Sequence, residues 1–176
     1  ASGIYARVVY MMPKAADDGD NHVVAEAFIA EWNKWIMLDP TYGSYCCDSS
    51  GEVLNLYEIR KRIINDEEYF FSDKLNYNGE TVSDLADLKE YYAKNLFFLR
   101  SKARQGYGMH REYGDMVEMA PINFDVHERM LMNLQYRNHE YGECDLFTDW
   151  MSYESQLDNR YVDIESFYEP PCDREN

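Results

Sequence analysis

Basic residues are scarce in this chain of 176 residues, with 17 Lys and Arg against 33 Asp and Glu and a net charge of −16. A nucleic-acid partner is therefore disfavoured, because phosphate binding needs a basic face. The imbalance is strongest over residues 142–176, which hold ten acidic and two basic residues. We interpret this stretch as a solvated acidic tail, in preference to an interaction surface for a basic partner.

Cysteines and long apolar runs are also few. The four cysteines, Cys46, Cys47, Cys144 and Cys172, are too sparse for a disulfide scaffold. Adjacent Cys46 and Cys47 cannot pair with each other without strain, although either could pair with a distant cysteine. No apolar run approaches the ~18 residues of a membrane span, and no signal peptide is visible. The compartment stays open, with a periplasmic or secreted location favoured.

The composition is otherwise that of a globular protein, with 45% hydrophobic and 28% charged residues. Sixteen tyrosines suit β-structure and binding surfaces. We expect one domain, with residues 1–106 as core plus helical extension and residues 107–176 as an accessory β-rich segment and acidic tail. The chain starts without Met and enters a strand almost at once, which predicts that an upstream segment belongs before it.

The first forty residues predict three strands. Residues 5–12, 22–30 and 34–39 are rich in β-branched and aromatic side chains, and Pro13 and Pro40 follow two of them. Only a short connection separates the second and third runs. Short connections favour antiparallel hairpins.

Two helices are expected next. Asn55 and Glu58 resemble a capping box for a helix over residues 56–65. Ser83 could cap a longer helix that Gly106 ends. Its apolar stripe is formed by Leu85, Leu88, Tyr92, Leu96, Leu99 and Ala103.

The remainder is expected to be extended at residues 116–119, 122–124 and 129–136, with the last thirty residues on the surface. The fold class is therefore predicted to be α+β, an antiparallel sheet with packed helices.

His22 and Asp39 are the candidate catalytic residues. His22 opens one strand of the predicted hairpin and Asp39 closes the next, so the two would lie beside each other. A carboxylate there could fix the imidazole tautomer and stabilise its protonated form. From spacing alone, a structural pair is favoured over a catalytic one.

The sequence motifs around His22 and Asp39 favour a catalytic pair. In order they are residues 3–9 (GIYARVV), 22–28 (HVVAEAF) and 34–41 (KWIMLDPT). Together they resemble the transglutaminase-like superfamily, whose core has a GIPAR-type strand followed by HxxxE and WxxLDPT. Tyr5 stands where proline is common. Residues 58–60 and 92–97 resemble, more loosely, an extension seen in bacterial members.

The resemblance implies a papain-like α+β fold in which a thiolate attacks an amide or peptide carbonyl. His22 would be the general base and acid, and Asp39 would orient it. No cofactor or metal is implied. Hydrolysis is favoured over cross-linking, and the partners would be a protein or peptide substrate and an upstream fragment.

One departure from the family is serious. The nucleophile helix and the oxyanion donors normally precede the GIxAR strand, and nothing precedes it here. We expect this chain to supply His22 and Asp39 only and to be inactive alone. The cysteines present lack helix-start placement and are disfavoured as nucleophiles. The alternative is a non-catalytic binding or scaffold module that kept the hairpin.

Other candidates are interpreted structurally. Residues 17–20 (DDGD) lack the ligand spacing of a calcium loop and are expected to form a solvated turn. Trp35 is expected in the core, whereas Trp32 could line a cleft. The histidines without metal-site spacing are His110, His127 and His139.

Overall fold

A computed structural model describes residues 4–102, 116–141, 160–161 and 164–171. Its main feature is a six-stranded sheet in the order β10-β9-β8-β1-β2-β3. Five strands run antiparallel, and the two-residue β10 pairs parallel with β9. The strands are β1 (Ala6–Met12), β2 (His22–Ile29), β3 (Lys34–Leu38), β8 (Phe98–Lys102), β9 (Met116–Met119) and β10 (Arg160–Tyr161). The prediction of an α+β fold with an antiparallel sheet is confirmed.

The hairpin of β2 and β3 forms as the sequence predicts. A single 3-10 turn, η1 (Ala30–Trp32), connects the strands, and Asn33 closes it in the left-handed conformation at φ 48°. Asparagine tolerates this conformation better than most residues, which suits it to this position. Ala25 pairs with Leu38, so residues that follow Leu38 run beside the start of β2.

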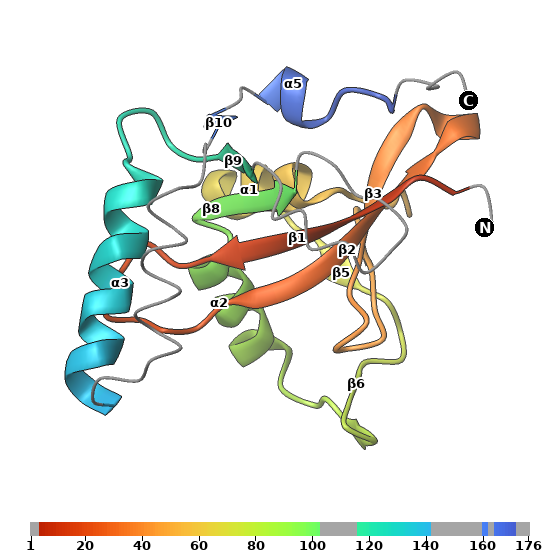
Figure 1. The fold of residues 1–176 in the computed structure, drawn as a ribbon. Coiled ribbons are helices and arrows are strands. Elements are labelled where there is room, and N and C mark those ends of the chain that lie inside the picture. Colours follow the sequence, from red (N-terminus) through yellow and green to blue (C-terminus); the bar gives the residue numbers. More distant parts are fainter. Residues whose placement is uncertain (1–3, 103–115, 142–159, 162–163, 172–176) are drawn as a thin grey trace.

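Successive strand residues face two separate cores. Met11 pairs with Leu99 in the larger core, whereas Met12 pairs with Phe98 in the smaller one. The elements that pack on the larger core include α1 (Leu56–Asn65), α2 (Leu85–Asn95) and the ribbon of β4 (Cys46–Cys47) and β5 (Phe70–Phe71). The helix α3 (Val126–Tyr141) packs on the other face, at the left of Figure 1. A small hairpin of β6 (Asn76–Tyr77) and β7 (Glu80–Thr81) projects from the larger-core side.

Helix α1 confirms its capping box. The Asn55 side chain accepts from the Glu58 backbone N–H, and the Glu58 side chain accepts from Asn55. The longer predicted helix was wrong at both ends. Asp84 rather than Ser83 caps α2, which stops at Asn95.

The predicted stripe of α2 continued into residues that form β8. Residues 98–101 are all buried because the two faces of β8 pack in two different cores, with Phe98 in the smaller core and Leu99 in the larger one. A run of buried residues in a central strand shows no two-residue alternation, so its apolar positions extended the helical pattern by coincidence. Ala103 and Gly106 lie outside the described residues.

Beyond the gap, β9 confirms the strand predicted at residues 116–119. The predictions for residues 122–124 and 129–136 were wrong, since the first is a turn and the second lies in α3. The buried face of α3 includes the polar Arg129 and Asn133. Their side chains donate to backbone carbonyls of residues 15–18, which conceals the helical period from a hydrophobicity pattern.

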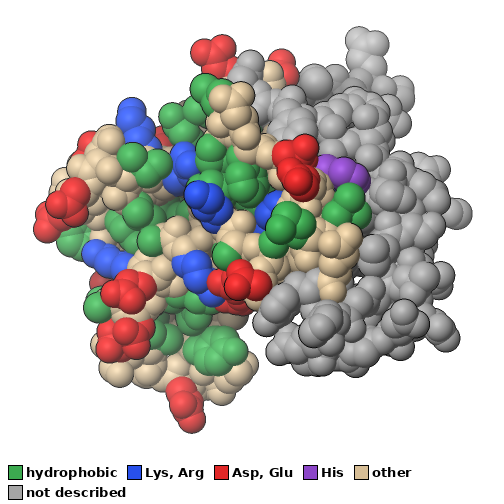
Figure 2. Space-filling view, turned by 90° about the vertical axis from the view of Figure 1, so that its left-hand side faces the viewer, with side chains coloured by type: hydrophobic (Ala, Val, Ile, Leu, Met, Phe, Trp, Pro, Cys, Tyr) green, Lys and Arg blue, Asp and Glu red, His purple; other side chains and the backbone are tan. Residues whose placement is uncertain are grey.

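The C-terminal segment does more than cover the surface. The short helix α5 (Ile164–Phe167) buries Phe167 in the larger core. Residues 142–159 and 172–176 of the predicted acidic tail lie outside the described residues. Over the part of the face in Figure 2 that is described, acidic and basic side chains are interspersed with hydrophobic ones. No described helix has the length and apolar character needed to cross a membrane.

Candidate functional site

His22 and Asp39 meet in the interior. His22 opens β2, and Asp39 follows the last residue of β3, so the hairpin brings them together. The His22 Nε2 atom lies 2.6 Å from Asp39 Oδ2. The two residues are only 4% and 1% exposed. The predicted proximity is confirmed, while the catalytic role stays a prediction.

The Asp39 carboxylate is held from several directions. Its Oδ1 atom accepts from the backbone N–H groups of Thr41 and Tyr42, at 2.9 and 3.2 Å. Its Oδ2 atom accepts from the Tyr92 hydroxyl as well as facing His22. Such bonds satisfy a buried carboxylate and restrict its rotation. Asp39 therefore presents Oδ2 to the imidazole in one orientation.

Three tyrosines enclose the imidazole. Ring centroids of Tyr42, Tyr91 and Tyr92 lie 5.6, 5.3 and 5.7 Å from that of His22. These rings cover the imidazole, which is almost completely buried. A carboxylate only accepts hydrogen bonds, which assigns the proton to Nε2 when Asp39 is ionised. No hydrogen bond joins Nδ1 to any of the described residues.

Burial, and then the charge of Asp39, raise the pKa of Tyr92 far above its ordinary value. Burial, and then Asp20, raise the pKa of Tyr91 in the same direction. Both hydroxyls therefore keep their protons at neutral pH. Tyr92 remains a donor to Asp39 under those conditions.

The described cysteines are unsuited to attack a carbonyl. Cys46 and Cys47 are free and form β4, so they lie in a strand and not at a helix start. Cys46 is completely buried, and burial followed by the nearby Asp39 raises the pKa of its thiol. A nucleophilic cysteine needs the opposite shift. Cys144 and Cys172 lie outside the described residues.

A second buried polar centre uses the other motif residues. Arg7 pairs with Glu26 across β1 and β2, with its Nε and Nη2 atoms 3.0 and 2.7 Å from Glu26 Oε2. Glu26 Oε1 accepts from the backbone of Leu56, at the start of α1, and from the Tyr168 hydroxyl. A negative charge is stabilised at a helix N-terminus. Sequence reasoning missed this centre, although Arg7 and Glu26 both stand in the quoted motifs.

The same arginine ties the C-terminal segment to the sheet. Its Nη1 atom lies 2.5 Å from the Phe167 carbonyl oxygen, and its guanidinium stacks between the rings of Trp35 and Phe167. The Trp35 indole N–H donates to the Glu169 carbonyl. Trp35 is buried as predicted, and Trp32 is 59% exposed.

The acidic loop at residues 17–20 is at least partly exposed, as expected, and is also anchored by an ion pair. The Lys94 ammonium on α2 lies 3.1 Å from Asp18 and 2.8 Å from Asp20. Burial opposes the shift, but hydrogen bonds from Asp20 and Lys94 hold the pKa of Asp18 below its ordinary value. The loop also lies beside the site, since Asp20 Oδ1 is 3.5 Å from the hydroxyl of Tyr91, whose ring contacts His22.

No cluster of described His, Cys, Asp and Glu residues could hold a metal ion. His127 is half-buried on α3, away from the hairpin pair. His110 lies outside the described residues, and nothing is described of the His139 side chain.

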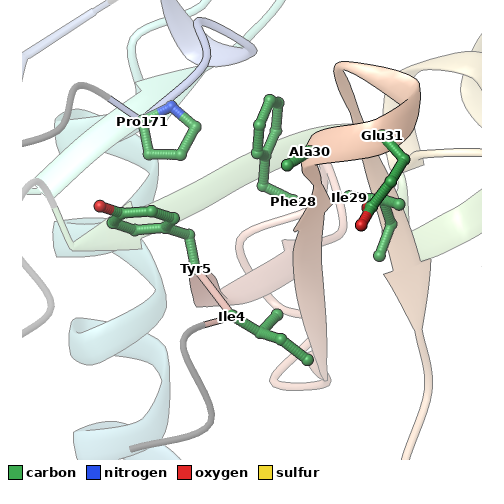
Figure 3. Close-up of a pocket in the computed structure, with 7 residues that line it drawn as sticks. All are labelled: Ile4, Tyr5, Phe28, Ile29, Ala30, Glu31 and Pro171. Carbon is green, nitrogen blue, oxygen red and sulfur yellow. The ribbon is translucent and has the colours of Figure 1, made fainter.

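A mainly apolar depression lies at the far end of β2 from His22 (Figure 3). Its lining comes from the start of β1, from β2 with η1, and from Pro171 of the C-terminal segment. It is therefore separate from the His22–Asp39 pair.

Comparisons with protein-family models, with curated proteins and with solved structures found no match to this chain. The function of this chain is therefore inferred from the geometry around His22 and Asp39 and from the motifs that contain them.

Proposed function

We propose that this chain carries the histidine and the aspartate of a Cys-His-Asp site in a transglutaminase-like hydrolase or acyltransferase. The substrate class is protein or peptide amides. His22 is the general base and acid, and Asp39 orients it.

One observation carries the proposal: His22 Nε2 and Asp39 Oδ2 lie 2.6 Å apart, with the carboxylate fixed by the backbone of its own turn and by the Tyr92 hydroxyl of α2. Aspartate bound to one ring nitrogen selects the tautomer and stabilises the imidazolium that forms during catalysis. In this proposal the second nitrogen, Nδ1, exchanges a proton with the reacting thiol. The quoted motifs around both residues support the same assignment.

The reaction follows from these roles. Nδ1 of His22 takes the thiol proton, and the thiolate adds to the amide carbonyl carbon. The imidazolium then returns its proton to the leaving amine, the C–N bond breaks, and a thioester remains. Water or an acceptor amine, deprotonated by His22, attacks the thioester and releases the thiol.

The thiol in this proposal comes from a segment outside these 176 residues. Cys46 is excluded by complete burial and a raised thiol pKa. A chain assayed without such a segment is expected to be inactive.

The proposal is tested in the full natural polypeptide that carries this sequence. Ammonia release from a glutaminyl dipeptide is measured with and without a primary amine, beside hydrolysis of peptide amides. His22→Ala is expected to lower kcat/KM by about 10³-fold or more. His127→Ala, which changes a histidine outside the site, is the matched control and should stay near wild type. Equal activity of the folded His22→Ala protein would sink the proposal.

A non-catalytic module is the second candidate. It is favoured by the enclosure of His22, whose side chain is 5% exposed beneath three tyrosine rings. Thiol alkylation near neutral pH separates the two candidates. A cysteine that reacts much faster than Cys47 supports the enzyme, whereas slow labelling of every cysteine together with no turnover supports the module.

A further inference from the structure

We propose that Tyr92 is a positioning residue of this site, whose hydroxyl holds the Asp39 carboxylate so that Oδ2 faces His22. The inference rests on the proposed function for its catalytic consequence, but the positioning itself is independent of turnover.

The hydrogen bonds of Asp39 divide between its two oxygens. The backbone of Thr41 and Tyr42 fixes Oδ1 through the local turn. Oδ2 has two described partners, His22 and the Tyr92 hydroxyl. Tyr92 is thus the one described group besides His22 itself that fixes the oxygen used by the imidazole.

Tyr92 can impose this position because its own is determined elsewhere. The residue lies on α2, is completely buried, and belongs to the larger core with Leu88 and Leu96. Its ring also contacts Phe71 of β5 edge-on, at 5.1 Å between centroids. The packing of α2 therefore fixes the position of the Tyr92 hydroxyl, and the hydroxyl fixes the orientation of the Asp39 carboxylate. Burial keeps that hydroxyl protonated, so it donates throughout the neutral range.

The neighbouring Tyr91 is a matched control. Its ring also contacts His22, yet its hydroxyl lies 3.5 Å from Asp20 Oδ1 in the acidic loop. Removal of either hydroxyl leaves an aromatic ring beside the imidazole. Only the loss at Tyr92 removes a donor to Asp39.

The experiment is ¹⁵N and ¹H NMR of His22 in the 176-residue chain, comparing Tyr92→Phe and Tyr91→Phe with wild type. Solvent exchange of the His22 Nε2 proton should accelerate by about tenfold or more in Tyr92→Phe. This is the factor expected when one charge-assisted hydrogen bond, here from the Tyr92 hydroxyl to Asp39, is lost. The Nδ1–H tautomer should also increase. Tyr91→Phe should stay within about twofold of wild type. Unchanged exchange in Tyr92→Phe, or equal acceleration in both variants, would overturn the proposal.

A wild-type measurement decides the matter if Tyr92→Phe does not fold. The Tyr92 hydroxyl proton should exchange slowly and show a nuclear Overhauser contact with the His22 Nε2 proton, and a missing contact would refute the positioning. In the active polypeptide, Tyr92→Phe should lower kcat and leave KM near wild type, since it alters orientation and not binding. If His22→Ala retained full activity, the proposed function would fail while the NMR result still decided the role of Tyr92.

Discussion

Replacing Arg7 with methionine should destabilise the fold more than the loss of any exposed ion pair. The substitution keeps an apolar stem between the rings of Trp35 and Phe167 and removes the guanidinium. Glu26, which is completely buried, then loses two hydrogen bonds and its counter-charge. It keeps the Leu56 N–H and the Tyr168 hydroxyl as donors.

The expected loss of stability depends on the two hydrogen-bond donors that Glu26 keeps. Breaking a buried ion pair from one side costs about 3–5 kcal/mol. Because two donors to Glu26 remain, we expect about 3 kcal/mol, a large part of the roughly 5–15 kcal/mol that stabilises a domain. The corresponding fall in Tm is about 6–12 °C, at roughly 2–4 °C per kcal/mol for a chain of this size.

The assay is urea unfolding followed by far-ultraviolet circular dichroism, with the slope of the transition compared between proteins. Lys94→Met is the control, since its partners Asp18 and Asp20 are also partly exposed. Exposed pairs contribute at most about 1 kcal/mol. A loss in Arg7→Met no larger than in the control would refute the structural role assigned to Arg7 and Glu26.

Three further predictions concern the cysteines, the tyrosines and the first helix. Peptide mass spectrometry after alkylation of the native chain should show Cys47 labelled well before buried Cys46, and equal rates would contradict the burial of Cys46. The pKa values of Tyr92 and Tyr168 are raised by burial and then by the adjacent carboxylates. Their contribution to stability is therefore full below the ordinary pKa of 10.0 and is lost as the pH rises above it. Urea midpoints should fall above pH 10, and tyrosinate absorbance should rise fully only on unfolding; complete ionisation in the folded chain would contradict this. Asn55→Ala should cost about 1 kcal/mol in urea unfolding, because it removes the capping box of α1, and an unchanged midpoint would count against that box.

Local signals were sufficient for β1, for the hairpin of β2 and β3 and for α1, but not for β4, because Cys46 and Cys47 were expected in a loop. Strand propensity, a short connection and a capping box predicted β1, the hairpin and α1 with bounds close to those found. The meeting of His22 and Asp39 follows from the hairpin alone, since antiparallel pairing brings the start of one strand to the end of the next.

Long-range contacts decided the rest. The strand β8 was hidden because its two faces pack in two different cores, with Phe98 in the smaller core and Leu99 in the larger one. Helix α3 was hidden because its buried face carries Arg129 and Asn133, which bind carbonyls more than a hundred residues away. The run of four apolar residues at 96–99 was an available signal against a continuous amphipathic helix.

At the site, too, local sequence patterns predicted one part and long-range contacts determined the other. Motif spacing identified the pair, but its support by Tyr92 depends on α2 packing over the hairpin, which no local pattern specifies. The pairing of Arg7 with Glu26 could have been inferred from the antiparallel register of β1 and β2, once both strands were predicted.

The most direct test of the account is the kcat/KM of Asp39→Asn in the full natural polypeptide, on the same glutaminyl dipeptide and peptide amides. The substitution preserves the shape of the side chain and removes the charge that orients and stabilises the His22 imidazolium. If the pair is catalytic, kcat/KM should fall by about three to four orders of magnitude in a protein that remains folded by circular dichroism. A folded Asp39→Asn protein within about tenfold of wild type would contradict the account.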